Sequence, residues 1–215
     1  MPALNAKQKE AIIKNPDILN EDIKRTNQSR FNLHAYDTKY FGSVMDTLCD
    51  AGLYKQAISY AEASITYTAL KPKNLMPAFL KTLERAFDDD YDPQEIYNHT
   101  TSLDNFGDTI DMYKLVKLQA GCLIELSKNS DAPEESLKNC ENALEKTREF
   151  LLVNEKNPMA TALYIWTLSF AAEEGFRDLV QSEQELCKEN HIYDPRLNIT
   201  FDGFLLPPTN KGLYL

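Results

Sequence analysis

The side chains that perform most enzyme chemistry are few and scattered in this chain. The three histidines, His34, His99 and His191, stand far apart, and none adjoins a cysteine or carboxylate motif. A zinc site draws its ligands from a clustered set, so we expect no metal centre and place His99 in a loop. The sequence also lacks a nucleophile elbow, a phosphate-binding loop and a dinucleotide fingerprint. We therefore predict a protein that is not an enzyme and needs no cofactor.

Carboxylates gather in the run Asp88-Asp89-Asp90-Tyr91-Asp92. Carboxylate oxygens are hard ligands that suit cations such as calcium, but a calcium loop also needs a glycine and a terminal glutamate at fixed spacing. Because the run has neither, we interpret it as the solvated end of a helix. Asp92 followed by Pro93 then predicts the start of the next helix, since aspartate caps helices and proline suits the first turn.

Four cysteines, Cys49, Cys122, Cys140 and Cys187, lie far apart in apolar helical segments. They form no Cys-x-x-Cys pair, so we expect buried free thiols in a reducing compartment. The first residues lack the apolar segment of a signal peptide. These features predict a cytoplasmic protein, with the nucleus or an organelle surface reached through a partner as the alternatives.

The formal net charge of −10 restricts the kinds of partner. Nucleic acids and anionic membranes need clustered Lys and Arg, so neither is expected, and no apolar run is long enough to insert into a bilayer. A basic peptide or protein is compatible with this charge. The charge is equally compatible with a surface that only keeps the protein in solution. The oligomeric state stays open.

The positions of apolar residues determine the fold prediction. They recur three and four apart in successive segments, and no alternating run predicts a strand, so we expect an all-α chain of about seven to nine helices. Prolines start several segments, and Asp131 and Glu134 have the spacing of a capping box. The predicted helical segments are 4–14, 36–51, 54–70, 75–87, 93 onward, 108–126, 133–154, 158–175 and 176–189.

The chain divides into three parts on this basis. Residues 1–35 form an N-terminal arm with short helices, residues 36–192 form a helical-repeat domain, and residues 193–215 form an apolar C-terminal segment. A disordered tail is normally polar. We therefore expect 193–215 to pack on the helices or on a partner, and name Phe204, Leu213 and Tyr214 as candidate partner-binding residues.

The segment Ala51-Gly52-Leu53-Tyr54 followed by Ala57 and Ala61 predicts a tight turn and a helix that another helix can approach closely. Together with the helix from Tyr36 it resembles one tetratricopeptide repeat. Phe41 and Met45 depart from the residues that this family prefers. The resemblance implies stacked antiparallel helical hairpins in a right-handed solenoid that binds other proteins.

The same resemblance implies a groove lined by the first helix of the hairpin. Lys39, Asp46, Cys49 and Asp50 would then face the groove. Asp46 and Asp50 lie one helical turn apart and could jointly bind a Lys or Arg of a partner. We name these four residues as candidate partner-binding residues.

A shorter resemblance lies at the end of the sequence. The residues Pro208-Thr209-Asn210-Lys211-Gly212-Leu213-Tyr214-Leu215 resemble a segment near the end of the helical cytosolic domain of the yeast peroxisomal tail-anchored proteins that recruit an AAA export motor. This resemblance implies a membrane-recruited motor adaptor, although the transmembrane tail of that family is absent from these residues.

The function predicted from the sequence is that of a non-enzymatic protein–protein interaction adaptor or scaffold. One alternative is a structural subunit of a larger helical assembly, held by the C-terminal segment or the N-terminal arm. Another is a small-molecule binding or enzymatic domain with a pocket between helices. Partner binding that survives or fails on deletion of 193–215 distinguishes the first two, and a ligand screen tests the third.

Overall fold

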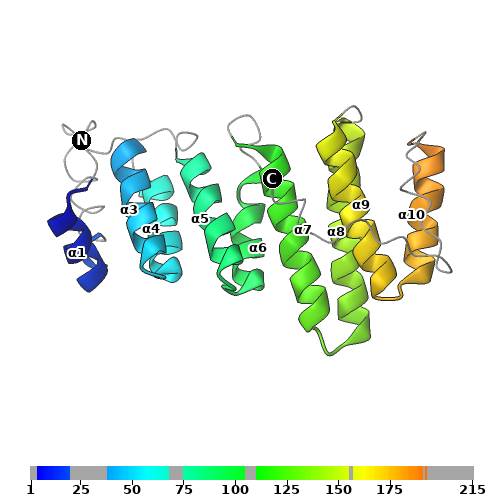
Figure 1. The fold of residues 1–215 in the computed structure, drawn as a ribbon, viewed down its shortest axis with the longest axis horizontal. Coiled ribbons are helices and arrows are strands. Elements are labelled where there is room, and N and C mark those ends of the chain that lie inside the picture. Colours follow the sequence, from blue (N-terminus) through cyan, green and yellow to red (C-terminus); the bar gives the residue numbers. More distant parts are fainter. Residues whose placement is uncertain are drawn as a thin grey trace. The chain divides into compact units, whose positions relative to one another are not determined.

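The computed structural model describes residues 4–19, 38–67, 75–104, 110–154, 157–190 and 192. Within them the chain is all-α, with nine helices and no strand (Figure 1), which confirms the predicted fold class. The helices are α1 (Ala6–Lys14), α3 (Thr38–Asp50), α4 (Tyr54–Tyr67), α5 (Met76–Asp88), α6 (Pro93–Thr101), α7 (Met112–Asn129), α8 (Pro133–Val153), α9 (Pro158–Glu173) and α10 (Arg177–Glu189).

Side chains of capping residues start α6 and α9. The start of α8 differs from the prediction. The Asp92 carboxylate accepts from the backbone N–H of Gln94 at 2.8 Å, and the Asn157 side chain accepts from that of Met159 at 3.0 Å. The predicted capping box at α8 is wrong. Ala132 is the N-cap and makes no side-chain bond there, because the chain enters the helix one residue later than Asp131 would require.

Three helices end in the same backbone motif. At the end of α3 the N–H of Leu53 bonds to the carbonyl of Leu48, and the N–H of Gly52 bonds to that of Cys49, both at 2.9 Å. This is the Schellman pattern, which requires a left-handed residue at the position of Gly52. The end of α5 and the end of α9 repeat it, with Asp90 and Gly175 in that position. The predicted helix ends at Gly52 and Gly175 are confirmed.

Gly52 permits a direct stability test. Its φ is +70°, and a Cβ built there would meet nothing within 4 Å, so a side chain is opposed by backbone conformation and not by a clash. We expect Gly52→Ala to lower the free energy of unfolding by about 1 kcal/mol. Urea denaturation measures this loss. Gly42, which lies inside α3 with equal room, is the control, because alanine favours the helix there and should leave stability unchanged or raised.

The chain forms two compact units, and the boundary between them lies between Leu118 and Gln119, inside α7. In the first unit α3 packs on α4 and α5, α4 also packs on α5, and α5 packs on α6. The N-terminal helix α1 packs on α3, where the backbone N–H of Leu4 donates to the Ser43 hydroxyl at 3.2 Å. The core side of these contacts is apolar and includes Phe41, which stacks on Tyr60 with ring centroids 5.6 Å apart.

The contacts between helices fix their directions. Asp46 meets Lys81 and Asp50 meets Arg85, and each pair is 35 residues apart. Partners on two helices keep a constant difference in residue number only when the helices run in the same direction, because both rise equally along the axis. Helices α3 and α5 are therefore parallel, and α4, joined to α3 by a tight turn and packed against both, runs the opposite way (Figure 1).

The second helices of the two hairpins obey the same rule. The rings of Tyr54 and Tyr91 lie 6.3 Å apart, and His99 contacts Glu62. Both pairs are 37 residues apart, so α6 runs parallel to α4. The α3–α4 hairpin and the α5–α6 hairpin thus repeat one arrangement within the first unit.

In the second unit α9 packs on both α8 and α10. Most of α9 is apolar and buried, which is typical of a helix covered on several sides. Ser127 and Ser136 join α7 to α8, since each hydroxyl donates to the backbone carbonyl of the other serine, at 2.8 and 2.9 Å. Two polar side chains are thereby buried with their hydrogen bonds made.

Hydropathy along the described helices gives one further finding. No helix in those parts of the chain is both long and apolar enough to cross a membrane.

A candidate binding site between two parallel helices

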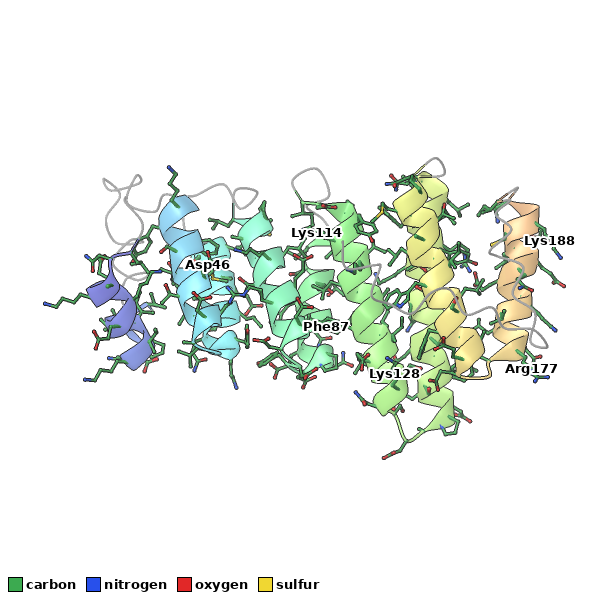
Figure 2. All side chains as sticks on the ribbon, viewed as in Figure 1. Asp46, Phe87, Lys114, Lys128, Arg177 and Lys188 are labelled. Carbon is green, nitrogen blue, oxygen red and sulfur yellow. The ribbon has the colours of Figure 1, made fainter. Side chains whose placement is uncertain are left out.

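Asp46 lies on α3, next to α5 (Figure 2), and Asp50 ends the same helix one turn later. Asp46 accepts from Lys81 at 2.9 Å and lies 3.5 Å from Arg85, whose other nitrogen meets Asp50 at 2.8 Å. The two carboxylates that we predicted to bind a partner's cation therefore already contact cations of the next hairpin. Their role in partner binding stays a prediction.

The other predicted binding residues have different surroundings. Lys39 is exposed on α3. Cys49 is buried, with 3% of its surface exposed, so that it packs in the core and does not line an open surface. Phe204, Leu213, Tyr214 and the rest of the predicted C-terminal segment lie outside the described residues, as does the predicted resemblance at 208–215.

All four cysteines are buried and free, as predicted from their apolar surroundings. Burial raises the pKa of Cys122 and Cys140 to about 12, because a thiolate loses its hydration in an apolar interior. Burial also raises the pKa of Cys49 and Cys187. Thiols in this state are poor nucleophiles, so the cysteines stabilise the packing and are not suited to catalysis.

The buried thiols predict a loss of stability in alkali. In the unfolded chain a thiol ionises near its ordinary value of 9.0, whereas in the folded chain Cys122 and Cys140 stay protonated until about pH 12. Between these values the unfolded state releases protons that the folded state retains, so rising pH favours unfolding. We expect the urea midpoint to fall steadily as pH rises above about 9. The Cys122→Ala/Cys140→Ala protein should show a shallower decline, and an equal decline would contradict this account.

A buried polar cluster joins α8, α9 and α10 of the second unit. The Glu183 carboxylate on α10 accepts from the Tyr164 hydroxyl on α9 at 2.7 Å and pairs with the Arg148 guanidinium on α8. The Cys187 thiol donates to the same tyrosine oxygen at 3.4 Å. Burial and the Glu183 charge raise the pKa of Tyr164, so its hydroxyl stays a donor. Every member of the cluster is satisfied within it, which indicates a role in holding α10.

A pocket of about 340 Å³ opens between α4 and α6, within the first unit. Its lining combines charged, polar, aromatic and aliphatic side chains from both helices and from the turn before α6. They are Lys55, Ile58, Ser59, Glu62, Tyr91, Glu95, Asn98 and His99. We call this pocket the α4/α6 groove.

The parallel register sets the order of these side chains along the groove. Tyr91 lies level with the start of α4, and His99 lies level with Glu62. Glu95 precedes His99 by four residues within α6 and so lies about 6 Å before the level of Glu62 along the axis. Lys55 precedes Glu62 by seven residues, which places the ammonium end of the groove about 10 Å from the Glu62 end. The groove therefore has one cationic end and a stretch with two carboxylates.

Hydrogen bonds hold both carboxylates in place. The His99 imidazole Nδ1 lies 2.7 Å from Glu62 Oε1, and the imidazole also meets the Phe79 ring edge-on, with centroids 6.4 Å apart. The Tyr91 hydroxyl donates to Glu95 Oε2 at 2.5 Å. This bond and partial burial raise the pKa of Tyr91 to about 12, so the phenol remains a donor at neutral pH. Each carboxylate is thus positioned by a hydrogen bond to one of its two oxygens.

This groove is not among the sites predicted from the sequence. The prediction that His99 lies in a loop is wrong, because the Asp92 cap and Pro93 start a helix that continues through His99 to Thr101. A signal was present in the sequence. Tyr54 and Tyr60 on α4 recur as Tyr91 and Tyr97 at the same spacing, 37 residues later. That repeat would have placed α4 and α6 in equivalent positions.

The groove has the composition of a binding site. No group of three or more His, Cys, Asp or Glu side chains within the described ranges could hold a metal ion. Two fixed carboxylates, a phenol and an amide supply acceptors for a polar ligand, and Ile58 and the Tyr91 ring supply apolar contact.

Comparisons of the whole chain with protein-family models, with curated proteins and with solved structures give no significant match.

Proposed function

We propose that this protein is a non-enzymatic adaptor that binds another protein through its first helical unit, as the resemblance of residues 36–64 to a tetratricopeptide repeat implies. The observation that carries the proposal is the repetition of one hairpin arrangement. The α3–α4 and α5–α6 hairpins share a direction, a register and a helix-ending motif. Repeated hairpins of this kind present extended surfaces that bind proteins.

The α3/α5 face and the α4/α6 face of the first unit differ in how their charged side chains are paired, and this difference favours the α4/α6 face as the partner-binding surface. On the face of α3 and α5 the carboxylates meet Lys81 and Arg85, and Glu84 of α5 lies 3.7 Å from Lys114. On the face of α4 and α6 an open groove carries polar groups with capacity for further bonds. The α4/α6 groove is therefore the surface that we assign to the partner.

The experiment is affinity capture of the full chain from native extract, with crosslinking and mass spectrometry. The proposal expects a stoichiometric protein partner with crosslinks to Lys55 beside the groove. A Ser59→Trp variant, which places a large side chain in the groove from an exposed position, should lose that partner. Crosslinks confined to α8–α10, or equal capture by the variant, would contradict the assignment of this surface. A chain that captures no protein in stoichiometric amount would contradict the adaptor function itself.

A further inference from the structure

The two carboxylates of the α4/α6 groove have hydrogen-bond partners that carry no permanent charge. Glu95 accepts its hydrogen bond from the uncharged Tyr91 phenol, and the partner of Glu62 is His99, which is charged only when protonated. Asp46 and Asp50, by contrast, meet Lys81 and Arg85 directly. Acidic side chains of the same unit thus fall into a pair on α3 that contacts Lys81 and Arg85 and a pair in the groove whose hydrogen-bond partners are a phenol and an imidazole.

The position of the two carboxylates suits a single cationic side chain. They come from opposite walls of the groove, and the register places them about one helical turn apart along its axis. The partly exposed Tyr91 ring can cover an aliphatic stem, while Asn98 adds an amide at the Glu62 end. Lys and Arg side chains bury their stems on apolar surface and present the charge at the tip.

We propose that the α4/α6 groove binds a lysine or arginine side chain of a partner protein, with Glu62 and Glu95 as its anionic ligands. This inference rests on the adaptor function proposed above and specifies the chemistry of the partner. Charge-assisted hydrogen bonds from two held carboxylates supply the affinity. Lys55, at the opposite end, repels a second cation, so the groove selects a segment with one basic residue at that position and not a dense basic run.

The test is binding of a fluorescein-labelled octapeptide of alanine and serine with a single central arginine to the full chain, measured by fluorescence anisotropy. The same peptide with lysine, with citrulline and with glutamate in place of arginine completes the probe set. We expect the arginine and lysine peptides to bind and the citrulline and glutamate peptides to bind at least about tenfold more weakly, the scale of losing one charge-assisted hydrogen bond.

A chain of net charge −10 attracts any basic peptide, so the variants are matched in charge. Glu62→Gln/Glu95→Gln removes the two groove carboxylates. Glu141→Gln/Glu145→Gln removes two exposed carboxylates one turn apart on α8, in the other unit. We expect about a tenfold or greater loss of affinity for the groove pair and less than about twofold for the α8 pair. Equal losses would show binding by overall charge, and no loss in the groove pair would overturn the proposal, as would failure of the unmodified chain to bind the arginine peptide.

Ser59→Arg provides a second and independent variant. Ser59 is exposed and lines the groove one turn before Glu62, so an arginine there supplies the groove with its own guanidinium and should block the peptide. Ser182→Arg on the exposed face of α10 is the control. All variants change exposed positions and should retain the melting temperature of the unmodified chain. A Ser59→Arg protein that binds the peptide as well as the Ser182→Arg protein contradicts the proposal.

The two proposals fail in different ways. If the native partner is captured by the unmodified chain and equally by the Glu62→Gln/Glu95→Gln variant, the adaptor function stands and the cationic groove is wrong. If no partner is captured but the peptide result is as expected, the groove chemistry stands and the adaptor function is wrong.

Discussion

The substitution Glu183→Gln should lower the free energy of unfolding by about 3 kcal/mol. It leaves the Arg148 guanidinium, whose side chain is 20% exposed, without the carboxylate with which it forms an ion pair, and breaking a buried ion pair typically costs about 3–5 kcal/mol. The substituent has almost the same volume, so the loss reports the charge and not a cavity. Urea denaturation followed by circular dichroism measures it.

A double-mutant cycle separates the pair from its surroundings. Arg148→Met with Glu183→Gln removes both charges, and we expect the double variant to be more stable than the sum of the two single losses predicts, by about 1.5 kcal/mol or more. Tyr164→Phe should cost only about 1 kcal/mol, since it removes one hydroxyl that donates to Glu183. A loss below about 0.5 kcal/mol for Glu183→Gln would show a pair screened by solvent.

The second large effect on stability is expected at Phe79, whose ring contacts the groove residue His99. Phe79 on α5 is 1% exposed, and its ring contacts His99 edge-on. We expect Phe79→Ala to lower the free energy of unfolding by about 3–5 kcal/mol, the range for removing a buried aromatic ring. Thermal and urea unfolding of the full chain measure this effect.

Phe79→Leu is the matched control, because it keeps an apolar side chain of similar size and should cost only about 1–1.5 kcal/mol. The functional consequence follows from the same contact. Without the ring, His99 loses the surface that orients it against Glu62, so the arginine peptide should bind Phe79→Ala more weakly than Phe79→Leu at a temperature where both are folded. Equal peptide affinities would mean that the imidazole is oriented by Glu62 alone.

The sequence was sufficient where a local rule acts on adjacent residues. Gly52 ends α3 because a left-handed residue completes the Schellman bonds, and the Asp92 carboxylate with Pro93 starts α6. Apolar spacing predicted the all-α class, and the apolar surroundings of the cysteines predicted their burial. The capping box at Asp131 failed because the chain enters α8 one residue later than that spacing assumes. Ala132 is the N-cap, and the Ser130 hydroxyl bonds to the Ala132 backbone.

The candidate site could not be predicted in the same way. Asp46 and Asp50 have suitable spacing for a ligand, but the sequence does not show that Lys81 and Arg85 lie beside them. The helix that packs beside an acidic pair decides whether the pair meets cations, as Asp46 and Asp50 do next to α5. For the same reason the sequence does not show that Glu62 and Glu95, 33 residues apart, line the same groove.

The sequence by itself determined most helices of this protein, the ends at Gly52 and Gly175 and the start at Asp92, because these depend on dihedral preferences, caps and spacing within a few residues. Only the tertiary structure decided which side chains meet across helices. The parallel register of α4 and α6 brings residues 37 positions apart into one groove, and no local interaction specifies that distance. It results from the packing of whole hairpins against one another, which buries their apolar faces and thereby places Glu62, His99, Tyr91 and Glu95 around a common pocket.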